Sequence, residues 1–353
     1  MNVLKFAKRA ALTVSKTSGM SGAVRQSAWR RDRLTILCYH GVSQDDEHRW
    51  KPSLYMTPAA LTDRMSLLQR GGYAVLPLGE ALQRLRERTL PPGAVALTFD
   101  DGMHDFAVNA APILERFGFP ATVYMATFYL GFDGPIFDVF CSYMIWRSRG
   151  ARIDLSELIP GAGVHDLAGP IGRELAFRAV VSYADQMAMS LLDKHHLATG
   201  LGALLGVDVA DLNKRQLLRV MPPDEARAMA ARGFDFQLHT HQHRVPRDEQ
   251  QFMDEIETNR AELLAISGRT PTHFCYPSGV YHAEFFPWLE RAGVVSATTC
   301  DTGIADPTTP LLLLPRIVDG AQLSGLEFEA WLSGAAAFLP TRETAQQREA
   351  ALA

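Results

Sequence analysis

Short apolar segments recur along most of this chain, and helical patterns lie between many of them. The apolar segments predict strands at 34–39, 73–76, 94–99, 121–126, 235–239, 272–276, 296–300 and 311–317. The patterns between them predict helices at 58–70, 105–117, 223–232 and 248–267, each followed by a glycine. Alternating strands and helices favour a parallel sheet, open or closed into a barrel. A chain of 353 residues is long enough for one α/β barrel with insertions or for two smaller domains.

The stretch at 128–222 interrupts this alternation. It is too long for an ordinary connection between a strand and a helix. Helical patterns at 137–146, 174–200 and 211–220 predict a helical insertion that covers or flanks the functional site. Aromatic residues are dense near its start, where they either line a sugar groove or form a small core.

The first 33 residues are strongly basic. They hold eight lysines and arginines but one acidic residue, a net charge of +7. Apolar residues alternate with the basic ones, so this arm is either a basic amphipathic helix at an anionic membrane surface, a solvated extension, or a helix packed on the domain. We therefore expect peripheral membrane contact through residues 1–33 as one alternative. The formal net charge of the whole chain is −4, which argues against nucleic acid as a partner.

The cysteines and the N-terminus together predict a cytoplasmic protein. The four cysteines lack CxxC spacing, and three of them lie in apolar strand-like segments, so we expect reduced, buried thiols. The basic arm has no long apolar core and no convincing small-residue cleavage site, so it does not resemble a secretory signal. We expect a cytoplasmic location, with peripheral attachment at the inner membrane face as an extension of it.

Two adjacent carboxylates follow the apolar segment at 94–97. The sequence there is Thr98-Phe99-Asp100-Asp101-Gly102. The carboxyl ends of strands are where parallel α/β folds place their chemistry. Successive strand residues point to opposite sides, so one aspartate is free to bind a metal while the other faces water or substrate. By itself the pattern is equally consistent with a turn after a strand.

Three histidines lie within five residues at the end of the strand predicted at 235–239. His239 and His243 are four residues apart, so on one helical turn they face the same side and share a metal. The alternative is a cluster of surface histidines. Thr240 stands where zinc proteases of the HExxH type carry their glutamate, so the general base has to come from another segment.

Asp100 and Asp101 supply what the histidines lack. Asp101, His239 and His243 make a metal site of two histidines and one carboxylate, with Asp100 beside it as general base. Zn²⁺ suits these ligands best, and Co²⁺, Ni²⁺, Mn²⁺ and Fe²⁺ also suit them. Such a site would activate a water for hydrolysis of a carbonyl substrate.

These two motifs resemble those of the polysaccharide deacetylases with NodB homology, carbohydrate esterase family 4. The resemblance covers roughly 34–318, apart from the insertion. It implies a distorted (β/α)₇ barrel, a divalent metal, and removal of N- or O-acetyl groups from sugars. It also implies that Asp100 is the base and that Asp101, His239 and His243 bind the metal.

The chain departs from the family pattern in two places. The third motif is usually Arg-x-Pro-x-Gly, but here it is Cys275-Tyr276-Pro277-Ser278-Gly279, without the arginine that orients the base. The late Leu-x-His motif that usually supplies the acid is not evident either, and Arg316 lies in that region. We expect Arg316 to replace the missing arginine, and Tyr276, Pro277, Ser278 and Gly279 to supply a backbone donor for the oxyanion and contacts to substrate.

An early histidine offers the missing acid. The segment Ile36-Leu37-Cys38-Tyr39-His40 is a predicted strand that ends in a histidine. It resembles the tyrosine-histidine motif of the branch that deacetylates bacterial poly-N-acetylglucosamine, in which an early histidine is the acid. We therefore assign to His40 the protonation of the departing amine. The alternative is a structural histidine bonded to a backbone carbonyl.

The sequence thus predicts a metal-dependent hydrolase of non-peptide carbon–nitrogen bonds. It would deacetylate an N-acetylated sugar in a polysaccharide or in a lipid-linked glycan precursor. The alternatives are another amidohydrolase or an O-acetyl esterase on the same scaffold, and a catalytically inactive carbohydrate-binding protein. The predicted organisation is a basic arm at 1–33, a catalytic domain at 34–340 with its insertion at about 128–222, and a tail at 341–353.

Overall fold

The computed structural model describes residues 10, 12–14 and 16–339 and divides the chain into two units. The first unit comprises Met1–Phe128 and Pro223–Ala353, and the second comprises Tyr129–Pro222. The predicted tail at 341–353 and the first nine residues of the predicted arm lie outside the described residues.

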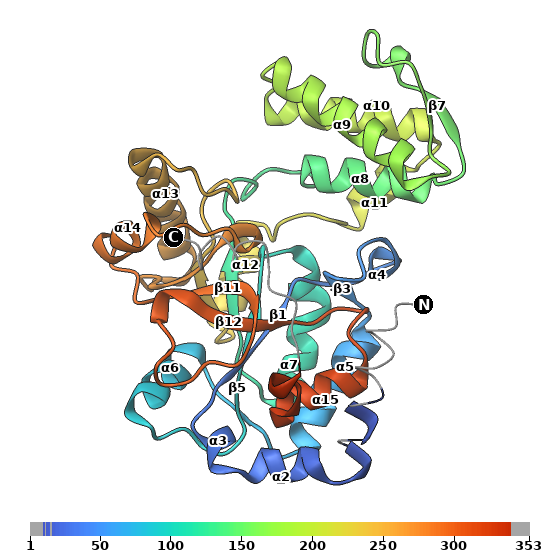
Figure 1. The fold of residues 1–353 in the computed structure, drawn as a ribbon. Coiled ribbons are helices and arrows are strands. Elements are labelled where there is room, and N and C mark those ends of the chain that lie inside the picture. The colour runs from blue at the N-terminus through green and yellow to red at the C-terminus, as the bar shows by residue number, and fades with distance from the viewer. Residues whose placement is uncertain (1–9, 11, 15, 340–353) are drawn as a thin grey trace. The chain divides into compact units, whose positions relative to one another are not determined.

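Seven parallel strands of the first unit close into a barrel (Figure 1). Around the ring, each strand pairs with the next in the order β1, β12, β11, β10, β9, β6 and β5. The ring closes because β5 also pairs with β1 over five consecutive residues, from Thr35 with Val95 to Tyr39 with Phe99. The strands are β1 (Thr35–Tyr39), β5 (Ala94–Phe99), β6 (Thr122–Met125), β9 (Asp235–Leu238), β10 (His273–Cys275), β11 (Ser296–Thr302) and β12 (Leu314–Val318). This confirms the predicted distorted (β/α)₇ barrel.

Helices surround the barrel (Figure 1). They are α5 (Pro58–Arg70), α6 (Leu78–Glu87), α7 (Ala111–Phe117), α12 (Pro223–Ala231), α13 (Glu249–Ser267), α14 (Phe285–Arg291) and α15 (Gly325–Ser333). Local signals in the sequence fix several of their ends. At the start of α5 the Thr57 hydroxyl accepts from the Ala60 N–H at 3.1 Å, and Pro58 occupies the first helical position, where its missing N–H costs nothing.

Shorter elements complete the first unit. The strand predicted at 73–76 is β4 (Ala74–Val75), which pairs with the start of β5 outside the closed ring. After β1 the chain forms β2 (Gly41–Val42), α4 (Glu47–Trp50) and β3 (Tyr55–Met56), and β2 pairs with β3. Short 3₁₀ turns are η3 (Pro277–Gly279), η4 (Leu311–Leu313) and η5 (Ala335–Phe338).

The helix predicted at 105–117 is not uniform. It begins as a π-helix, η1 (Phe106–Ala110), and continues as α7. Pro112 accounts for the change, because it has no N–H to donate to Val108 one turn earlier and its ring crowds that carbonyl. The wider turn places Asn109 beside β2, where its amide donates to the carbonyls of Val42 and Ser43 at 2.9 and 3.2 Å.

The barrel strands are buried on both faces, as closed parallel sheets require. Every residue of β1, β5 and β6 is buried. Because the strands are parallel, their carboxyl ends meet at one rim, and the residues that follow β1, β5, β9 and β10 are brought together there.

The second unit is helical with one hairpin. Its elements are α8 (Phe137–Arg147), β7 (Arg152–Asp154), η2 (Leu155–Glu157), β8 (Val164–Asp166), α9 (Pro170–Gln186), α10 (Leu191–Leu205) and α11 (Val209–Lys214). The helix predicted over 174–200 is in fact two helices, because Ser190 caps a new one by accepting from the Asp193 N–H at 3.2 Å. The helix predicted at 211–220 ends at Lys214, and the antiparallel β7–β8 hairpin was not predicted.

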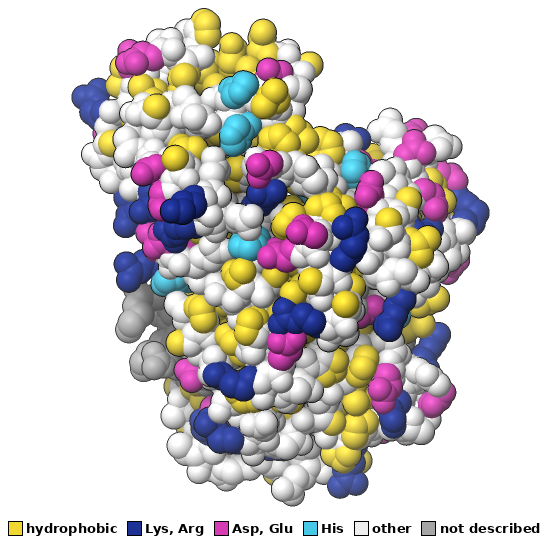
Figure 2. Space-filling model, turned by 180° about the vertical axis from the view of Figure 1, so that it is seen from behind, with side chains coloured by type: hydrophobic (Ala, Val, Ile, Leu, Met, Phe, Trp, Pro, Cys, Tyr) yellow, Lys and Arg dark blue, Asp and Glu magenta, His cyan; other side chains and the backbone are white. Residues whose placement is uncertain are grey.

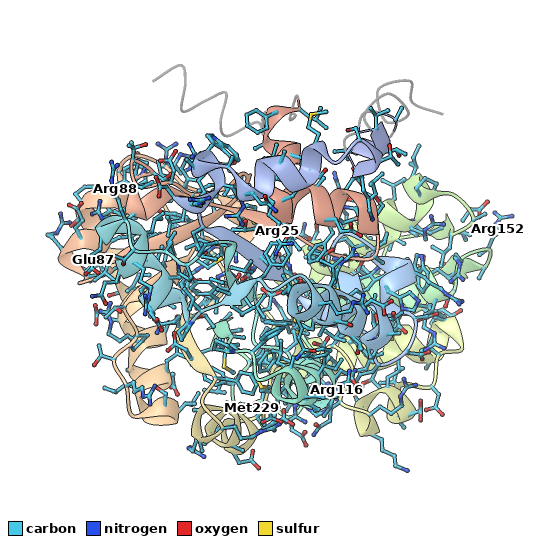
Figure 3. All side chains as sticks on the ribbon, turned by 90° about the horizontal axis from the view of Figure 1, so that it is seen from below. Arg25, Glu87, Arg88, Arg116, Arg152 and Met229 are labelled. Atoms are coloured by element: carbon cyan, nitrogen blue, oxygen red, sulfur yellow. The ribbon has the colours of Figure 1, made fainter. Side chains whose placement is uncertain are left out.

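The described part of the basic arm packs on the barrel unit. It forms α2 (Met20–Gln26) and α3 (Ala28–Arg31). Arg25, labelled in Figure 3, lies over the Tyr73 ring at 4.4 Å. Arg30 is fully buried and donates to the Leu332 carbonyl at 3.0 Å and to the Thr35 hydroxyl at 2.9 Å. Among the described helices, none has both the length and the apolarity needed to cross a membrane.

Candidate active site

The chain turns sharply after β5 and sends two adjacent carboxylates into different surroundings. The Asp100 N–H still donates to the Tyr39 carbonyl at 2.9 Å, and Asp100 is 3% exposed. Asp101 has a φ of 74°, in the left-handed region, and its side chain is 29% exposed. Gly102 is left-handed too, and a Cβ there would lie 2.4 Å from Met125 Cγ. The turn therefore requires a glycine at this position.

Two histidines from the segment after β9 approach Asp101. His239 Nε2 lies 3.4 Å from Asp101 Oδ1, and His243 Nε2 lies 3.3 Å from the same oxygen. The prediction that they share a helical turn is wrong. Thr240 and His243 have φ values of 60° and 55°, so the segment is a tight loop with two left-handed residues. Hydrogen bonds from α13 hold this loop, and it still places the imidazoles 4.8 Å apart between ring centroids.

A backbone carbonyl orients His239. Its Nδ1–H donates to the Cys275 carbonyl at 2.8 Å, which leaves Nε2 directed at Asp101. Burial lowers the pKa of His239, but the hydrogen bond to Asp101 and the charges of Asp100 and Asp101 outweigh it and raise the pKa. Burial raises the pKa of Asp101, but hydrogen bonds from His239 and His243 hold it well below the ordinary range. These contacts therefore keep Asp101 as a carboxylate that accepts from both imidazoles.

Asp101, His239 and His243 fit a divalent cation. One ligand atom from each lies within 4.8 Å of the others, and both imidazoles present Nε2 to the same carboxylate oxygen. Two imidazoles and a carboxylate suit zinc, and the same nitrogen and oxygen set also takes cobalt, nickel, manganese or iron(II).

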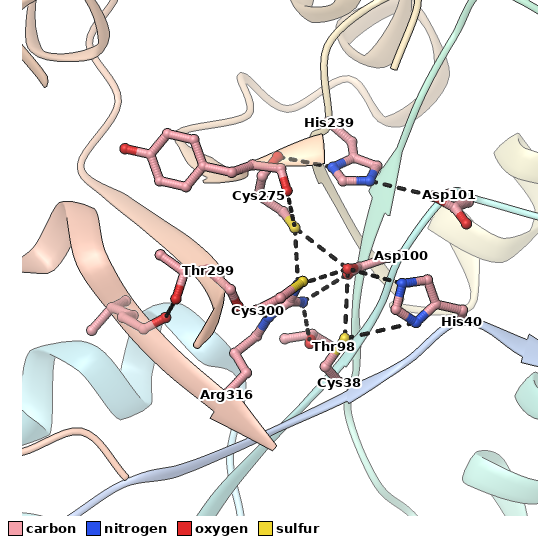
Figure 4. A network of polar contacts seen from close by, with 12 residues as sticks. Cys38, His40, Thr98, Asp100, Asp101, His239, Cys275, Thr299, Cys300 and Arg316 are labelled. Atoms are coloured by element: carbon pink, nitrogen blue, oxygen red, sulfur yellow. Dashed lines mark hydrogen bonds and ion pairs between the residues drawn. The ribbon is translucent and has the colours of Figure 1, made fainter. Parts of the chain in front are cut away.

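Asp100 is held by a buried arginine from another strand (Figure 4). Arg316, in β12, is fully buried and donates from Nη1 to Asp100 Oδ1 and from Nη2 to Asp100 Oδ2, both at 2.7 Å. Its Nε donates to the Thr299 carbonyl at 2.8 Å, so the fork is fixed in orientation. Burial raises the pKa of Asp100, but Arg316 outweighs it and brings the pKa well below the ordinary range.

Two thiols complete the surroundings of Asp100. Cys38 Sγ and Cys275 Sγ lie 3.5 and 3.4 Å from Asp100 Oδ2, and Arg316 Nη2 lies 3.1 Å from Cys275 Sγ. Burial raises the pKa of both thiols well above the ordinary value, so they remain protonated and donate to the carboxylate. Cys275 stands where the family motif carries its arginine, and its small side chain leaves room for the guanidinium of Arg316.

His40 lies on the other side of Asp100. Its Nε2 is 3.8 Å from Asp100 Oδ2, and its Nδ1 is 3.9 Å from Cys38 Sγ (Figure 4). Its side chain is 15% exposed, so it has access to the outside of the barrel. Burial lowers the pKa of His40, and the charges of Asp100 and Asp101 oppose this effect without cancelling it. The strand end predicted from the sequence thus places an imidazole beside the buried carboxylate.

The turn at Tyr276–Gly279 is strained and closely packed. Ser278 has a φ of 55°, and a Cβ at Gly279 would lie 2.7 Å from Cys300 Cβ. The N–H groups of Tyr276 and Gly279 donate to the carbonyls of Thr298 and Tyr276, and Pro277 has none, so neither of these two N–H groups is the expected oxyanion donor. The expectation that Tyr276 contacts a sugar does not hold, because its ring is fully buried and its hydroxyl donates to the Leu312 carbonyl.

Sequence reasoning missed several residues around this site. The thiols of Cys38 and Cys275 were expected only to be buried, and Glu255, Asn259 and Thr127 were not singled out. A signal was present for two of them, because Glu255 and Asn259 are polar residues one turn apart on the face of α13 that also carries Phe252 and Ile256. Buried polar side chains on an apolar helix face need partners, and here these include the backbone of residues 239–243, which we call the histidine loop.

The comparisons with known proteins find the family that the two motifs resemble. The family model described as "Polysaccharide deacetylase" matches residues 87–131 and 185–297. The poly-beta-1,6-N-acetyl-D-glucosamine N-deacetylase of Escherichia coli K12 is 29% identical over 118 residues, which are 32% of this chain and 17% of that protein. The chain thus matches less than a fifth of the length of this relative.

Two solved structures share the fold. The Streptococcus pyogenes deacetylase PplD, solved in complex with acetate, superposes with a TM-score of 0.54 at 19% identity, over 84% of this chain and 96% of that one. IcaB from Ammonifex degensii superposes with a TM-score of 0.55 at 16% identity, over 86% of this chain and 97% of that one. At these identities the likeness concerns the fold.

Proposed function

We propose that this chain, which matches the polysaccharide deacetylase family model over residues 87–131 and 185–297, is a metal-dependent enzyme that removes the N-acetyl group of a sugar in a polysaccharide or a lipid-linked glycan precursor. The observation that carries the proposal is the pairing of two carboxylates at one rim. Asp100 is ionised and fixed by Arg316, and it lies next to the cluster of Asp101, His239 and His243. A protein that only binds carbohydrate has no need of a fixed, ionised base.

Asp101, His239 and His243 would hold the cation, with zinc as the first candidate. A divalent cation bound there lowers the pKa of a coordinated water and polarises an acyl carbonyl.

Asp100 is the proton acceptor in this proposal. The bidentate contact with Arg316 keeps its carboxylate ionised throughout the neutral pH range, so it is present in the unprotonated form that a proton acceptor requires. The same contact fixes its orientation, because both carboxylate oxygens are engaged at 2.7 Å. A general base must lie within hydrogen-bond distance of the proton that it accepts. Because Asp100 is fixed, the reacting water has to bind within that distance of its carboxylate.

His40 is the proton donor to the leaving nitrogen. An amide leaves as an amine only when its nitrogen is protonated, so a donor is required close to the base. His40 Nε2 faces Asp100 at 3.8 Å and is open to the rim. Burial lowers the pKa of His40, which makes its imidazolium a stronger acid. The Ser278 N–H in the strained turn at 276–279 is the backbone donor for the developing oxyanion.

The nature of the substrate rests on the family and on the surface charge. On the face drawn in Figure 2, acidic and basic side chains are interspersed, which suits a neutral glycan better than a polyanion. A cytoplasmic location and a membrane contact through residues 1–33 remain predictions. Of the basic residues there, Arg25 and Arg30 are engaged in contacts with the barrel unit.

The test compares the metal content and the acetate release of the wild type and two variants. Wild-type protein should carry about one divalent cation per chain and release acetate from N-acetylglucosamine oligomers or from a membrane lipid extract; the better substrate identifies the glycan class. Asp100→Asn should keep the cation and lose turnover, by about three orders of magnitude or more. His239→Ala should lose the cation.

Each alternative has its own outcome. Bound cation without acetate release from any sugar would favour another amidohydrolase. Release from O-acetyl esters alone would favour an esterase. A wild type that binds no divalent cation, even after divalent ions are added back, would favour an inactive carbohydrate-binding protein.

A further inference from the structure

Two buried polar side chains on the inner face of α13 lie behind the histidine loop. Glu255 is 5% exposed and Asn259 is fully buried, and the two are one helical turn apart. Their neighbours on the same face, Phe252, Ile256 and Leu263, are fully buried and apolar. Polar groups in such a position are costly unless every one is hydrogen-bonded.

Asn259 connects the carboxyl ends of β9 and β6. Its Oδ1 accepts from the His239 N–H at 2.9 Å, which fixes the backbone where β9 ends. Its Nδ2 donates to the Met125 carbonyl at 2.9 Å and to the Thr127 hydroxyl at 3.0 Å, at and just beyond the end of β6. Met125 is also the residue against which Gly102 packs, with no room for a Cβ. The Asn259 side-chain amide thus connects His239 with Met125, the residue that packs against the turn after Asp101.

Thr127 extends the contact to the middle of the loop. Its hydroxyl lies 3.0 Å from His241 Nδ1, and its N–H donates to the His241 carbonyl at 3.1 Å. Because the hydroxyl already accepts from Asn259, its own proton is available for His241 Nδ1. His241 is therefore turned toward Thr127 while its neighbours two positions to either side face Asp101.

Glu255 holds the far half of the loop. One carboxylate oxygen accepts from the Gln242 N–H at 2.6 Å, and the other accepts from Arg244 Nε at 2.8 Å. The Glu255 carbonyl also accepts from the His241 N–H at 3.2 Å. Between these anchors, Thr240 and His243 adopt left-handed backbone conformations that a free loop would relax.

We infer that Asn259 and Glu255 are positioning residues of the metal site, which hold the strained loop so that His239 and His243 converge on Asp101. The inference rests on the proposed function, because it assumes that this cluster binds a divalent cation. Partners behind metal ligands raise affinity by keeping the ligands in place before the metal arrives, and their loss typically costs about ten- to a hundredfold in affinity.

The experiment measures the dissociation constant of the apoprotein for Zn²⁺ and Co²⁺ by competition with a chromophoric chelator. Asn259→Leu removes all three hydrogen bonds in nearly the same volume, and we expect the dissociation constant to rise at least tenfold. Glu255→Gln keeps one acceptor for the Gln242 N–H and loses the charge that pairs with Arg244, so a smaller rise is expected. Asn259→Asp keeps the acceptor for the His239 N–H, and it replaces Asn259→Leu if that variant does not fold.

Leu263→Ala is the matched control. Leu263 is a fully buried apolar residue one turn further along the same helix, so its truncation should lower the melting temperature of the apoprotein without changing the dissociation constant. If Asn259→Leu binds the ions as tightly as wild type, or if its dissociation constant rises no more than that of Leu263→Ala, the positioning role is wrong. The proposed function would not be affected by this result. If wild type binds neither ion, the proposed function fails together with this inference.

Discussion

Asp100 and Asp101 are neighbours in the sequence, yet their surroundings have almost nothing in common. Asp100 is enclosed by a guanidinium, two thiols and the barrel wall, whereas Asp101 lies at the open rim between two imidazoles. The left-handed backbone of Asp101 separates them, since it directs the chain away from the strand after Asp100. A single strand end can therefore supply two carboxylates with different tasks.

The two carboxylates also differ in what keeps them ionised. Both have a pKa well below the ordinary range in spite of burial. For Asp100 the cause is Arg316, whose charge does not titrate in the working range. For Asp101 the causes are hydrogen bonds from His239 and His243, which a bound cation would replace. The negative charge of Asp100 is thus always balanced by Arg316. The partners of Asp101 are the two histidines, and a cation can take their place.

Removing Arg316 should have the largest effect on this contrast. Arg316→Met leaves a buried carboxylate without its countercharge, and we expect a loss of about 3–5 kcal/mol in the free energy of unfolding together with loss of turnover. Urea denaturation and acetate release measure the two effects. The double variant Asp100→Asn/Arg316→Met should recover most of the stability, because no unpaired buried charge remains. It should recover none of the activity, because the base is missing.

Arg64→Met serves as the control for this prediction. Arg64 pairs with the buried Asp319 at 2.9 Å, so its loss should also reduce stability, while the folded protein keeps its turnover. A loss of less than about 1 kcal/mol in Arg316→Met would show that Asp100 is not held by this arginine in solution.

Most of the barrel could be predicted because its signals are local. The strands at 94–99 and 235–238 were found from apolar runs, and α5, α7 and α13 end where glycines follow. The misses were of two kinds. The capping box at Ser190 that divides α9 from α10 was overlooked, and the effect of Pro112 on the turn at 106–110 depends on the geometry of a helix already formed.

The site was less predictable, because much of it depends on contacts between distant segments. Asp100, Asp101, His239 and His243 stand in compact motifs, and the expected proximity of Arg316 to Asp100 is present in the structure. In contrast, the approach of Cys38 and Cys275 to Asp100 joins residues 62 and 175 positions away from it in the sequence. The left-handed loop was mistaken for a helical turn, since residues four apart meet in either geometry.

The variant His40→Ala tests whether His40 protonates the leaving amine. His40→Ala should slow amide hydrolysis by about 10²–10⁴-fold, because an amine departs only when it is protonated. Hydrolysis of an activated aryl ester, whose leaving group needs no proton, should slow far less. The ratio of the two rates, measured on the same preparation with its metal content determined, is the readout. An equal loss on both substrates would assign His40 a structural role.

Asp105 completes the comparison, because it is a third carboxylate near the same turn and the charges that shift its pKa are those of Glu47 and Asp101, both acidic. It is buried, and its Oδ1 has no hydrogen-bond partner among the described residues. Burial raises the pKa of Asp105 well above its ordinary value, and the charges of Glu47 and Asp101 add to the effect. The unfolded chain ionises near pH 4, so this residue reduces stability increasingly as the pH rises from there to its folded pKa.

Asp105→Asn should therefore stabilise the protein, by about 1–2 kcal/mol at pH 8 and by much less at about pH 3, where the wild-type carboxyl is mostly protonated in both states. Thermal unfolding at a series of pH values measures the difference. Asp63→Asn, an exposed change on α5, controls for the loss of one negative charge and should shift the melting temperature little at any pH. A destabilised variant at pH 8 would mean that the hydrogen bond between the Asp105 carboxylate and the Val42 backbone outweighs the cost of the buried charge. The contrast with Asp100 would then concern the kind of partner.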